Sequence, residues 1–120
     1  MRRAAVVCLA ALLAACGSQP PAPAWQLDAK GAMERYEQAW LTGADRAAQA
    51  EFARARGALA STGRGDLVAR AELVRCALQV ASLASPGGAC EGFEALRAEA
   101  AGPERAYAAY LSGARLPAAE

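Results

Sequence analysis

Apolar side chains recur at the spacing of an amphipathic helix through most of the chain. One segment begins at Asp28 and a second at Asp45, and in both the apolar residues return every three or four positions until a glycine. A third segment from Asp66 carries two apolar stripes. Because apolar residues then surround much of its circumference, we expect this helix to be the central and most buried one.

Two shorter helices are predicted after residue 89. One carries Phe93, and the last begins at Gly102 and Pro103, where proline suits a first helical position. No segment has the alternation of a strand. The joints are short and centred on glycine, so successive helices should be antiparallel neighbours. The pattern therefore predicts an all-α domain over residues 28–115, an up-and-down array of about five short helices.

The predicted core is rich in alanine, which buries less apolar area per residue than leucine does. The largest side chains of this core should therefore be aromatic. We expect the following aromatic residues to be buried: Trp40, Phe52, Phe93, Tyr107 and Tyr110. Trp25 precedes the first predicted helix. It could pack against that helix, or seat on a membrane interface or a partner.

Cys76 and Cys90 flank the predicted turn at residues 85–88, which lets the chain reverse and bring the two thiols together. An even pair in an exported protein usually forms a disulfide. Closing a loop of about 15 residues is worth about 3 kcal/mol. The alternative, a redox or metal-binding pair, lacks the Cys-x-x-Cys spacing and any histidine.

The first 16 residues have the three parts of an export signal: two arginines after Met1, an apolar run, and small residues before a cleavage point. The run from Ala4 to Ala15 is about 18 Å long as a helix, too short to cross a bilayer core of about 30 Å. An ordinary signal peptide would also end in small residues, but it has no need of Cys16.

Leu13-Ala14-Ala15-Cys16 resembles the lipobox of bacterial lipoproteins. The resemblance implies a signal peptide over residues 1–15, lipidation of Cys16, and a membrane anchor. Residues 16–27 would then be a lipidated, proline-rich tether, and residues 116–120 a tail. No aspartate follows Cys16, where many inner-membrane lipoproteins carry one. We therefore expect the outer membrane of a Gram-negative bacterium, with the domain facing the periplasm.

One predicted helical hairpin resembles a tetratricopeptide repeat. Gly43, Ala48, Phe52 and Ala55 match the second half of that pattern. The first half departs from it, because Ala32, Arg35 and Tyr36 stand where a large aromatic, a leucine and a small residue are usual. A generic amphipathic hairpin is the alternative. A true repeat would imply a groove that binds a peptide or a partner helix.

Charge and composition exclude several kinds of function. The chain has 13 basic and 12 acidic residues, and loss of Arg2 and Arg3 with the signal leaves 11 basic ones, which argues against a nucleic-acid partner. Histidine is absent, which removes the common catalytic triads and most zinc sites. We expect no catalytic residue, no metal and no cofactor.

The acidic residues have structural interpretations. The aspartates at helix starts should cap them; these are Asp28, Asp45 and Asp66. Acids in first turns should interact favourably with the positive end of the helix dipole; these are Glu91, Glu94 and Glu104. The remaining ones should be solvated; these are Glu34, Glu37, Glu51, Glu72 and Glu99.

The function that fits best is a non-enzymatic interaction module that holds another envelope protein. Pilotins, small helical lipoproteins that chaperone secretion-system or pilus components, are similar in architecture. The alternative is a protein that binds or modifies peptidoglycan through a groove carboxylate. A further possibility is a fragment or reduced member of a longer lipoprotein family.

Overall fold

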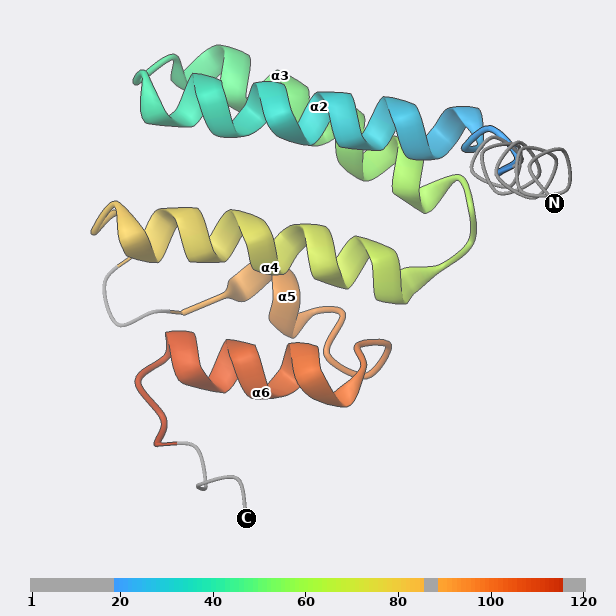
Figure 1. Cartoon of the computed structure of the whole chain (residues 1–120). Coiled ribbons are helices and arrows are strands. Elements are labelled where there is room, and N and C mark those ends of the chain that lie inside the picture. Colours follow the sequence, from blue (N-terminus) through green and yellow to red (C-terminus); the bar gives the residue numbers. More distant parts are fainter. Residues whose placement is uncertain (1–18, 86–88, 116–120) are drawn as a thin grey trace, which may run out of the picture.

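The computed structural model describes residues 19–85 and 89–115. The predicted signal peptide, Cys16, the turn at 86–88 and the tail at 116–120 lie outside these residues. Within them the chain forms helices and no strand, which confirms the all-α prediction. The helices are α2 (Ala24–Leu41), α3 (Asp45–Ala60), α4 (Gly65–Ala81), α5 (Glu91–Glu94) and α6 (Gly102–Leu111) (Figure 1).

The central position of α4 is confirmed. Helices α2 and α3 form an antiparallel hairpin on one side of α4, and α5 and α6 pack on its other side (Figure 1). The loop after α5 carries the chain back, so that α6 runs in the same direction as α4. No helix in the described ranges combines the length and apolar composition needed to cross a membrane.

Two apolar clusters share α4. On the hairpin side, Tyr36 and Phe52 pack with Ala48 and Ala71, and their ring centroids are 5.2 Å apart. On the other side lies a larger cluster, made of Ala69, Leu73, Cys76, Cys90, Phe93, Ala100 and Ala108. Because each cluster takes residues from α4, this helix is buried on both sides and joins the two halves of the fold.

The predicted aromatic core is only partly correct. Phe52 and Phe93 are buried, and Trp40 is half-buried. Tyr107 and Tyr110, by contrast, are 45% and 60% exposed. The reason is that α6 contacts the core through Ala108 and Leu111, while the two tyrosines stack on each other outside it, with centroids 6.1 Å apart.

The predicted disulfide is confirmed: Cys76 and Cys90 are bonded, with their Cα atoms 5.3 Å apart. Cys76 lies on α4, and Cys90 immediately precedes α5. The bond therefore fastens the short helix α5 to the central helix. A helix of one turn cannot hold itself together in water, so this attachment and the burial of Phe93 keep it in place.

Helices α2, α4 and α6 end in the same way. The residue after the C-cap has a positive φ, and the next amide donates to the carbonyl five residues earlier. This left-handed position is Gly43 in α2 and Gly113 in α6. In α4 it is Leu83, with φ of 58°. The stop predicted at Gly43 is therefore confirmed.

The predicted aspartate caps are wrong. The N-caps of the three long helices are Pro23, Ala44 and Arg64, and none makes a side-chain cap bond. Helix α2 begins at Ala24 because residues 24–27 contain no helix breaker and Pro23 can accept from the first free amides. Asp28 consequently lies within α2, and Asp45 and Asp66 lie in first turns.

Candidate functional site

Glu72 of α4 is buried, although the sequence pattern places it among solvated acids; that prediction is wrong. Its side chain is 5% exposed. Arg56 of α3 donates from Nε to Oε1 at 3.0 Å, and Nη2 of Arg75 lies 2.7 Å from Oε2. Two guanidinium groups thus compensate one carboxylate, which is how a buried charge is tolerated.

The ion-pair cluster of Glu72, Arg56 and Arg75 joins three helices. The guanidinium of Arg75 lies 4.5 Å above the ring centroid of Phe52, a cation–π contact from α4 to α3. Gly92 of α5 closes the other side, where an added Cβ would come within 2.2 Å of Glu72 Oε2. A side chain at this position would therefore displace the Glu72 carboxylate or the Arg75 guanidinium.

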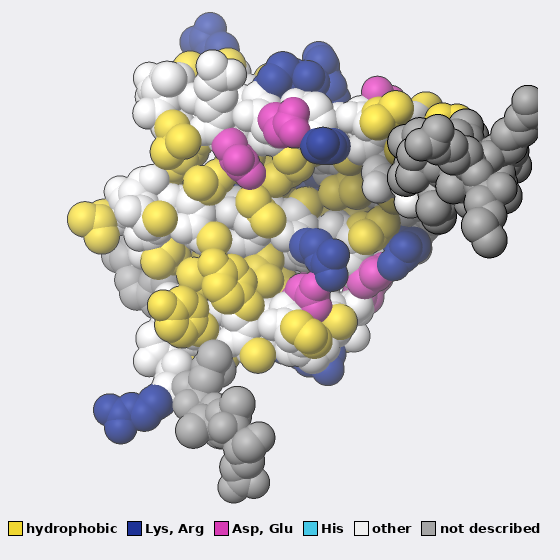
Figure 2. Space-filling model, viewed as in Figure 1, with side chains coloured by type: hydrophobic (Ala, Val, Ile, Leu, Met, Phe, Trp, Pro, Cys, Tyr) yellow, Lys and Arg dark blue, Asp and Glu magenta, His cyan; other side chains and the backbone are white. Residues whose placement is uncertain are grey.

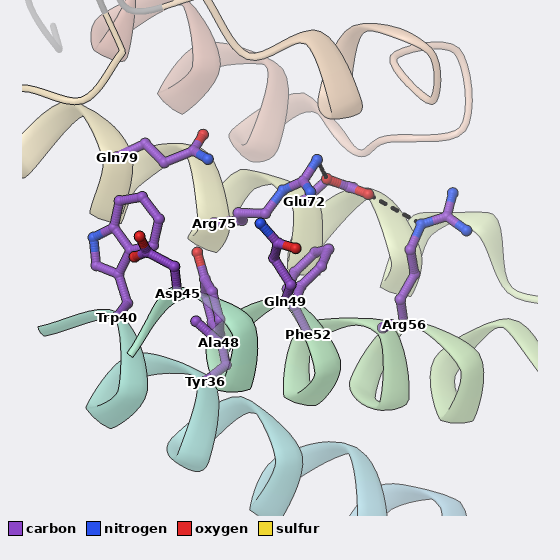
Figure 3. Close-up of a pocket in the computed structure, with 11 residues that line it drawn as sticks. Tyr36, Trp40, Asp45, Ala48, Gln49, Phe52, Arg56, Glu72, Arg75 and Gln79 are labelled. Atoms are coloured by element: carbon purple, nitrogen blue, oxygen red, sulfur yellow. Dashed lines mark hydrogen bonds and ion pairs between the residues drawn. The ribbon is translucent and has the colours of Figure 1, made fainter. Parts of the chain in front are cut away.

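A cavity of about 700 Å³ opens beside the cluster, and we call it the α3–α4 pocket (Figure 3). One wall is a stripe of α3, made of Asp45, Gln49, Phe52 and Arg56. These residues share one face because they are spaced by three or four positions. The facing wall is a stripe of α4, made of Glu72, Arg75 and Gln79. The pocket is thus lined by charged and amide groups together with the aromatic ring of Phe52.

Tyr36 reaches the α3–α4 pocket from α2. Its side chain points past α3 into the space between α3 and α4 (Figure 3). The residue is 2% exposed, and Oη is buried without a hydrogen-bond partner among the described residues. Burial raises the pKa of this phenol above its ordinary value of 10.0, an effect that the charge of Arg75 partly offsets. The hydroxyl therefore stays protonated at neutral pH and can donate a hydrogen bond.

Trp40 forms the end wall of the pocket. Its Nε1 donates to Ser82 Oγ at 3.0 Å, which links the end of α2 to the turn after α4. Asp45, the first residue of α3, also lines the pocket (Figure 3). This end of the pocket consequently combines an aromatic surface with an acidic group.

A second hollow, of about 340 Å³, lies between α2 and α4, and we call it the α2–α4 groove. Its apolar lining consists of Trp25, Ala29, Met33, Leu59, Leu67, Ala71 and Val74. Its polar lining consists of Gln26, Lys30, Glu37 and Arg70. Trp25, whose position the sequence left open, belongs to the first turn of α2 and to this groove.

The apolar surface continues from the groove towards α6. Arg70 and Val74 also line a smaller hollow of about 250 Å³ with Pro103 and Tyr107. Figure 2 shows hydrophobic side chains gathered over α4 and between it and the neighbouring helices on this face. The exposed, stacked pair Tyr107 and Tyr110 adds to the apolar area on α6.

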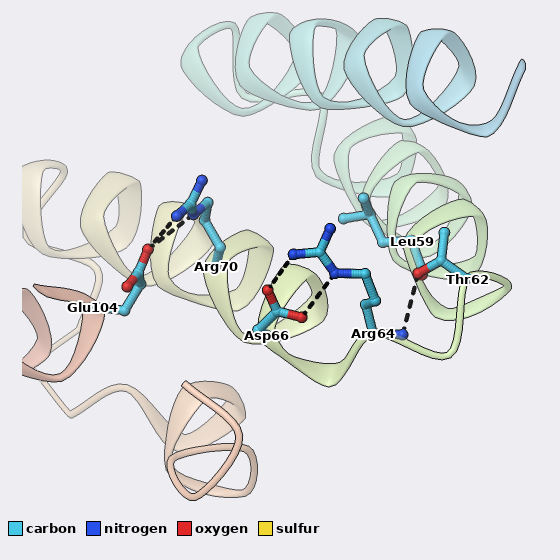
Figure 4. Close-up of polar contacts among 6 residues, drawn as sticks. All are labelled: Leu59, Thr62, Arg64, Asp66, Arg70 and Glu104. Atoms are coloured by element: carbon cyan, nitrogen blue, oxygen red, sulfur yellow. Dashed lines mark hydrogen bonds and ion pairs between the residues drawn. The ribbon is translucent and has the colours of Figure 1, made fainter. Parts of the chain in front are cut away.

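Ion pairs fix the helix ends beside this surface (Figure 4). Arg70 of α4 donates from Nε to Glu104 of α6 at 2.9 Å, and Arg64 pairs with Asp66 at 2.7 Å. Hydrogen bonds from Arg70 and Arg64 hold the pKa values of Glu104 and Asp66 below their ordinary values. The first-turn positions predicted for the acids of α5 and α6 are confirmed.

The residues with predicted roles are therefore a bonded pair, Cys76 and Cys90, and Cys16, which lies outside the described residues. Within residues 19–85 and 89–115, no three Cys, Asp or Glu side chains are grouped so that they could hold a metal ion. The polar pocket was not predicted. Comparison with known proteins gives no match to any family model and no significant match to a curated protein or a solved structure.

Proposed function

We propose that this chain is a lipid-anchored protein of the bacterial outer membrane whose periplasmic domain binds another envelope protein and catalyses no reaction. The anchor rests on the lipobox-like Leu13-Ala14-Ala15-Cys16. The Cys76–Cys90 bond is in keeping with export, because disulfides persist in oxidising compartments.

The observation that carries the binding role is the α2–α4 groove. Its walls are aliphatic and aromatic, and it continues into the exposed tyrosines of α6. Apolar surface that is continuous and rimmed by polar groups is typical of sites that bind other proteins. Along α2 the lining runs from Trp25 to Glu37, a helical distance of about 18 Å.

The occupant that fits is an amphipathic helix of about three turns from a partner protein. A helix laid into a groove buries one apolar face and leaves its flanks at the rim. The rim carries Lys30 and Glu37 on α2 and Arg70 on α4. Charges of both signs on the partner's flanks would complement these side chains, while Met33 and Val74 contact its apolar face.

The anchor is tested by mass spectrometry of the protein from its bacterial host. Cleavage before Cys16 and a mass increase equal to three acyl chains and glycerol are expected. The Cys16→Ala variant should lose both the mass increase and sedimentation with membranes. An unprocessed amino terminus in the unaltered chain would disprove the anchor.

The groove is tested by photocrosslinking in intact cells, with benzoylphenylalanine at Met33. Gln38, an exposed residue of the same helix outside the groove, provides the matched control. We expect one discrete adduct from position 33, none from position 38, and a partner peptide with helical apolar spacing. An adduct with a second copy of this chain, equal adducts at both positions, or none at all would contradict the proposal.

A further inference from the structure

We propose that the α3–α4 pocket binds a short peptide whose amino and carboxyl ends are both free. This site is separate from the α2–α4 groove. On α4 the pocket is lined by Glu72, Arg75 and Gln79, whereas the groove is lined by Leu67, Ala71 and Val74. At 3.6 residues per turn the centres of these two sets lie roughly 100° apart around the helix, and no residue lines both hollows. The inference therefore stands independently of the partner helix proposed above.

The two ends of the pocket carry opposite charge. At one end, Asp45 and Trp40 both line the pocket, and Asp45 has no ion-pair partner among the described residues. An acidic group together with an aromatic face suits an ammonium group. At the other end, Arg56 and Arg75 share the single carboxylate of Glu72. That end keeps a net positive charge, which suits a carboxylate.

The separation of the ends sets the length of the ligand. Asp45 and Phe52 are 7 residues apart on α3, a rise of about 10 Å. Arg75 lies directly over the Phe52 ring. A fully extended tripeptide also spans about 10 Å. A tripeptide would thus reach from Asp45 to the guanidinium of Arg75 with both termini in contact.

The middle of the pocket offers partners for a peptide backbone. Tyr36 Oη is buried, has no hydrogen-bond partner in the described structure, and points into the space. A buried polar atom of this kind needs a partner, and a bound amide would supply one. The amides of Gln49 and Gln79 stand on opposite walls. Because a side-chain amide both donates and accepts, the pair can bond a peptide unit from either side.

The remaining walls leave room for the side chains of the ligand. Ala48 and Ala53 of α3 leave the room that makes up the cavity of about 700 Å³. A space of this size accepts a ligand of a few residues. The charged ends and their separation therefore specify a tripeptide, and trialanine is the simplest probe.

The experiment measures binding of trialanine to the intact purified protein by calorimetry. N-acetyl-trialanine and trialanine amide test each charged end. We expect trialanine to bind and either blocked derivative to bind at least about tenfold more weakly, the loss of one charge-assisted contact. Asp45→Asn should reduce the difference between trialanine and its acetylated form. Asp28→Asn, which changes an exposed aspartate of α2, is the matched control and should leave binding unaltered.

The Tyr36→Phe variant shows whether the Tyr36 hydroxyl binds the ligand or only stabilises the fold. Because Oη has no partner in the described fold, its removal should leave the melting temperature unchanged or raise it, yet weaken trialanine several-fold. The proposal is wrong if trialanine gives no heat, if both blocked forms bind as well as the free peptide, or if Tyr36→Phe binds normally. Failure of the Met33 crosslink leaves these readouts unaffected.

Discussion

Leu83 departs from the pattern that the other helix ends follow. It adopts φ of 58° where α2 and α6 have glycine, and its side chain is 90% exposed. A left-handed conformation costs a residue with a Cβ about 1 kcal/mol or more, and nothing buried compensates that here. Leu83→Gly should therefore raise the free energy of unfolding by about 0.5 to 1 kcal/mol.

Urea denaturation checks this, with Leu41→Gly as the control. Leu41 is also exposed but lies in the last turn of α2 with helical geometry. Glycine there should destabilise by about 0.5 to 1 kcal/mol. Equal losses in both variants would show that the left-handed position carries no strain.

Among the described residues, Glu72 is the charged residue that is buried. Replacing it with glutamine keeps the shape but leaves Arg56 and Arg75 without an anion. Both arginines reach solvent, so the loss should be about 1.5 to 3 kcal/mol, below that of a fully buried pair. Glu34→Gln breaks only the exposed pair with Lys30 and should change stability by less than about 0.5 kcal/mol. Similar losses in the two variants would contradict a structural role for the cluster.

At the scale of the helices, the sequence predicts where a helix forms better than it predicts which of its side chains are buried. The two apolar stripes of α4 are enough to predict its central place. The same stripes do not decide the burial of Glu72, because Arg70 on the same helix is 65% exposed while Glu72 is 5% exposed. In α6 the spacing shows which residues share a face, but nothing local shows whether a neighbour covers it. Tyr107 and Tyr110 were misplaced for that reason.

Helix α6 should be sensitive to acid because Glu104 fastens it to α4 through Arg70. The pKa of Glu104 is lowered in the folded state, so its stabilisation is present above about pH 4.5 and is lost as the pH falls through the folded value. Asp66 and Glu94, paired with other arginines, have lowered pKa values too. Glu104→Gln should show a smaller fall in urea midpoint between about pH 6 and about pH 3 than the unaltered chain. An identical fall would exclude Glu104 as a contributor.

Helix α5 depends on the disulfide. Replacing Cys76 and Cys90 by serine should lower the free energy of unfolding by about 3 kcal/mol, since the bond closes a loop of about 15 residues. Hydrogen exchange should show protection lost first in residues 91–111 and retained in the α2–α3 hairpin. Uniform loss across the chain would mean that the two sides of α4 unfold as one unit.

At the scale of the whole molecule, two sites use different faces of α4, and residue spacing alone predicts neither of them. Helical spacing predicts that Asp45, Gln49, Phe52 and Arg56 share a face of α3. It does not predict that this face lies opposite Glu72 and Arg75, because the crossing of α3 and α4 depends on packing by Tyr36 and Ala71. Residue spacing within one helix determines which side chains share a face. The pocket depends in addition on how two helices pack against each other.

The two tryptophans report on the two sites separately. The chain contains two, Trp25 in the α2–α4 groove and Trp40 in the α3–α4 pocket. Trialanine should therefore change the fluorescence of the Trp25→Phe variant, which retains Trp40, and leave that of Trp40→Phe unaltered. A peptide copied from the crosslinked partner helix should give the reverse pattern, because burial of an indole shifts its emission to shorter wavelength. A response of both tryptophans to either ligand would show that the two sites are coupled and not independent.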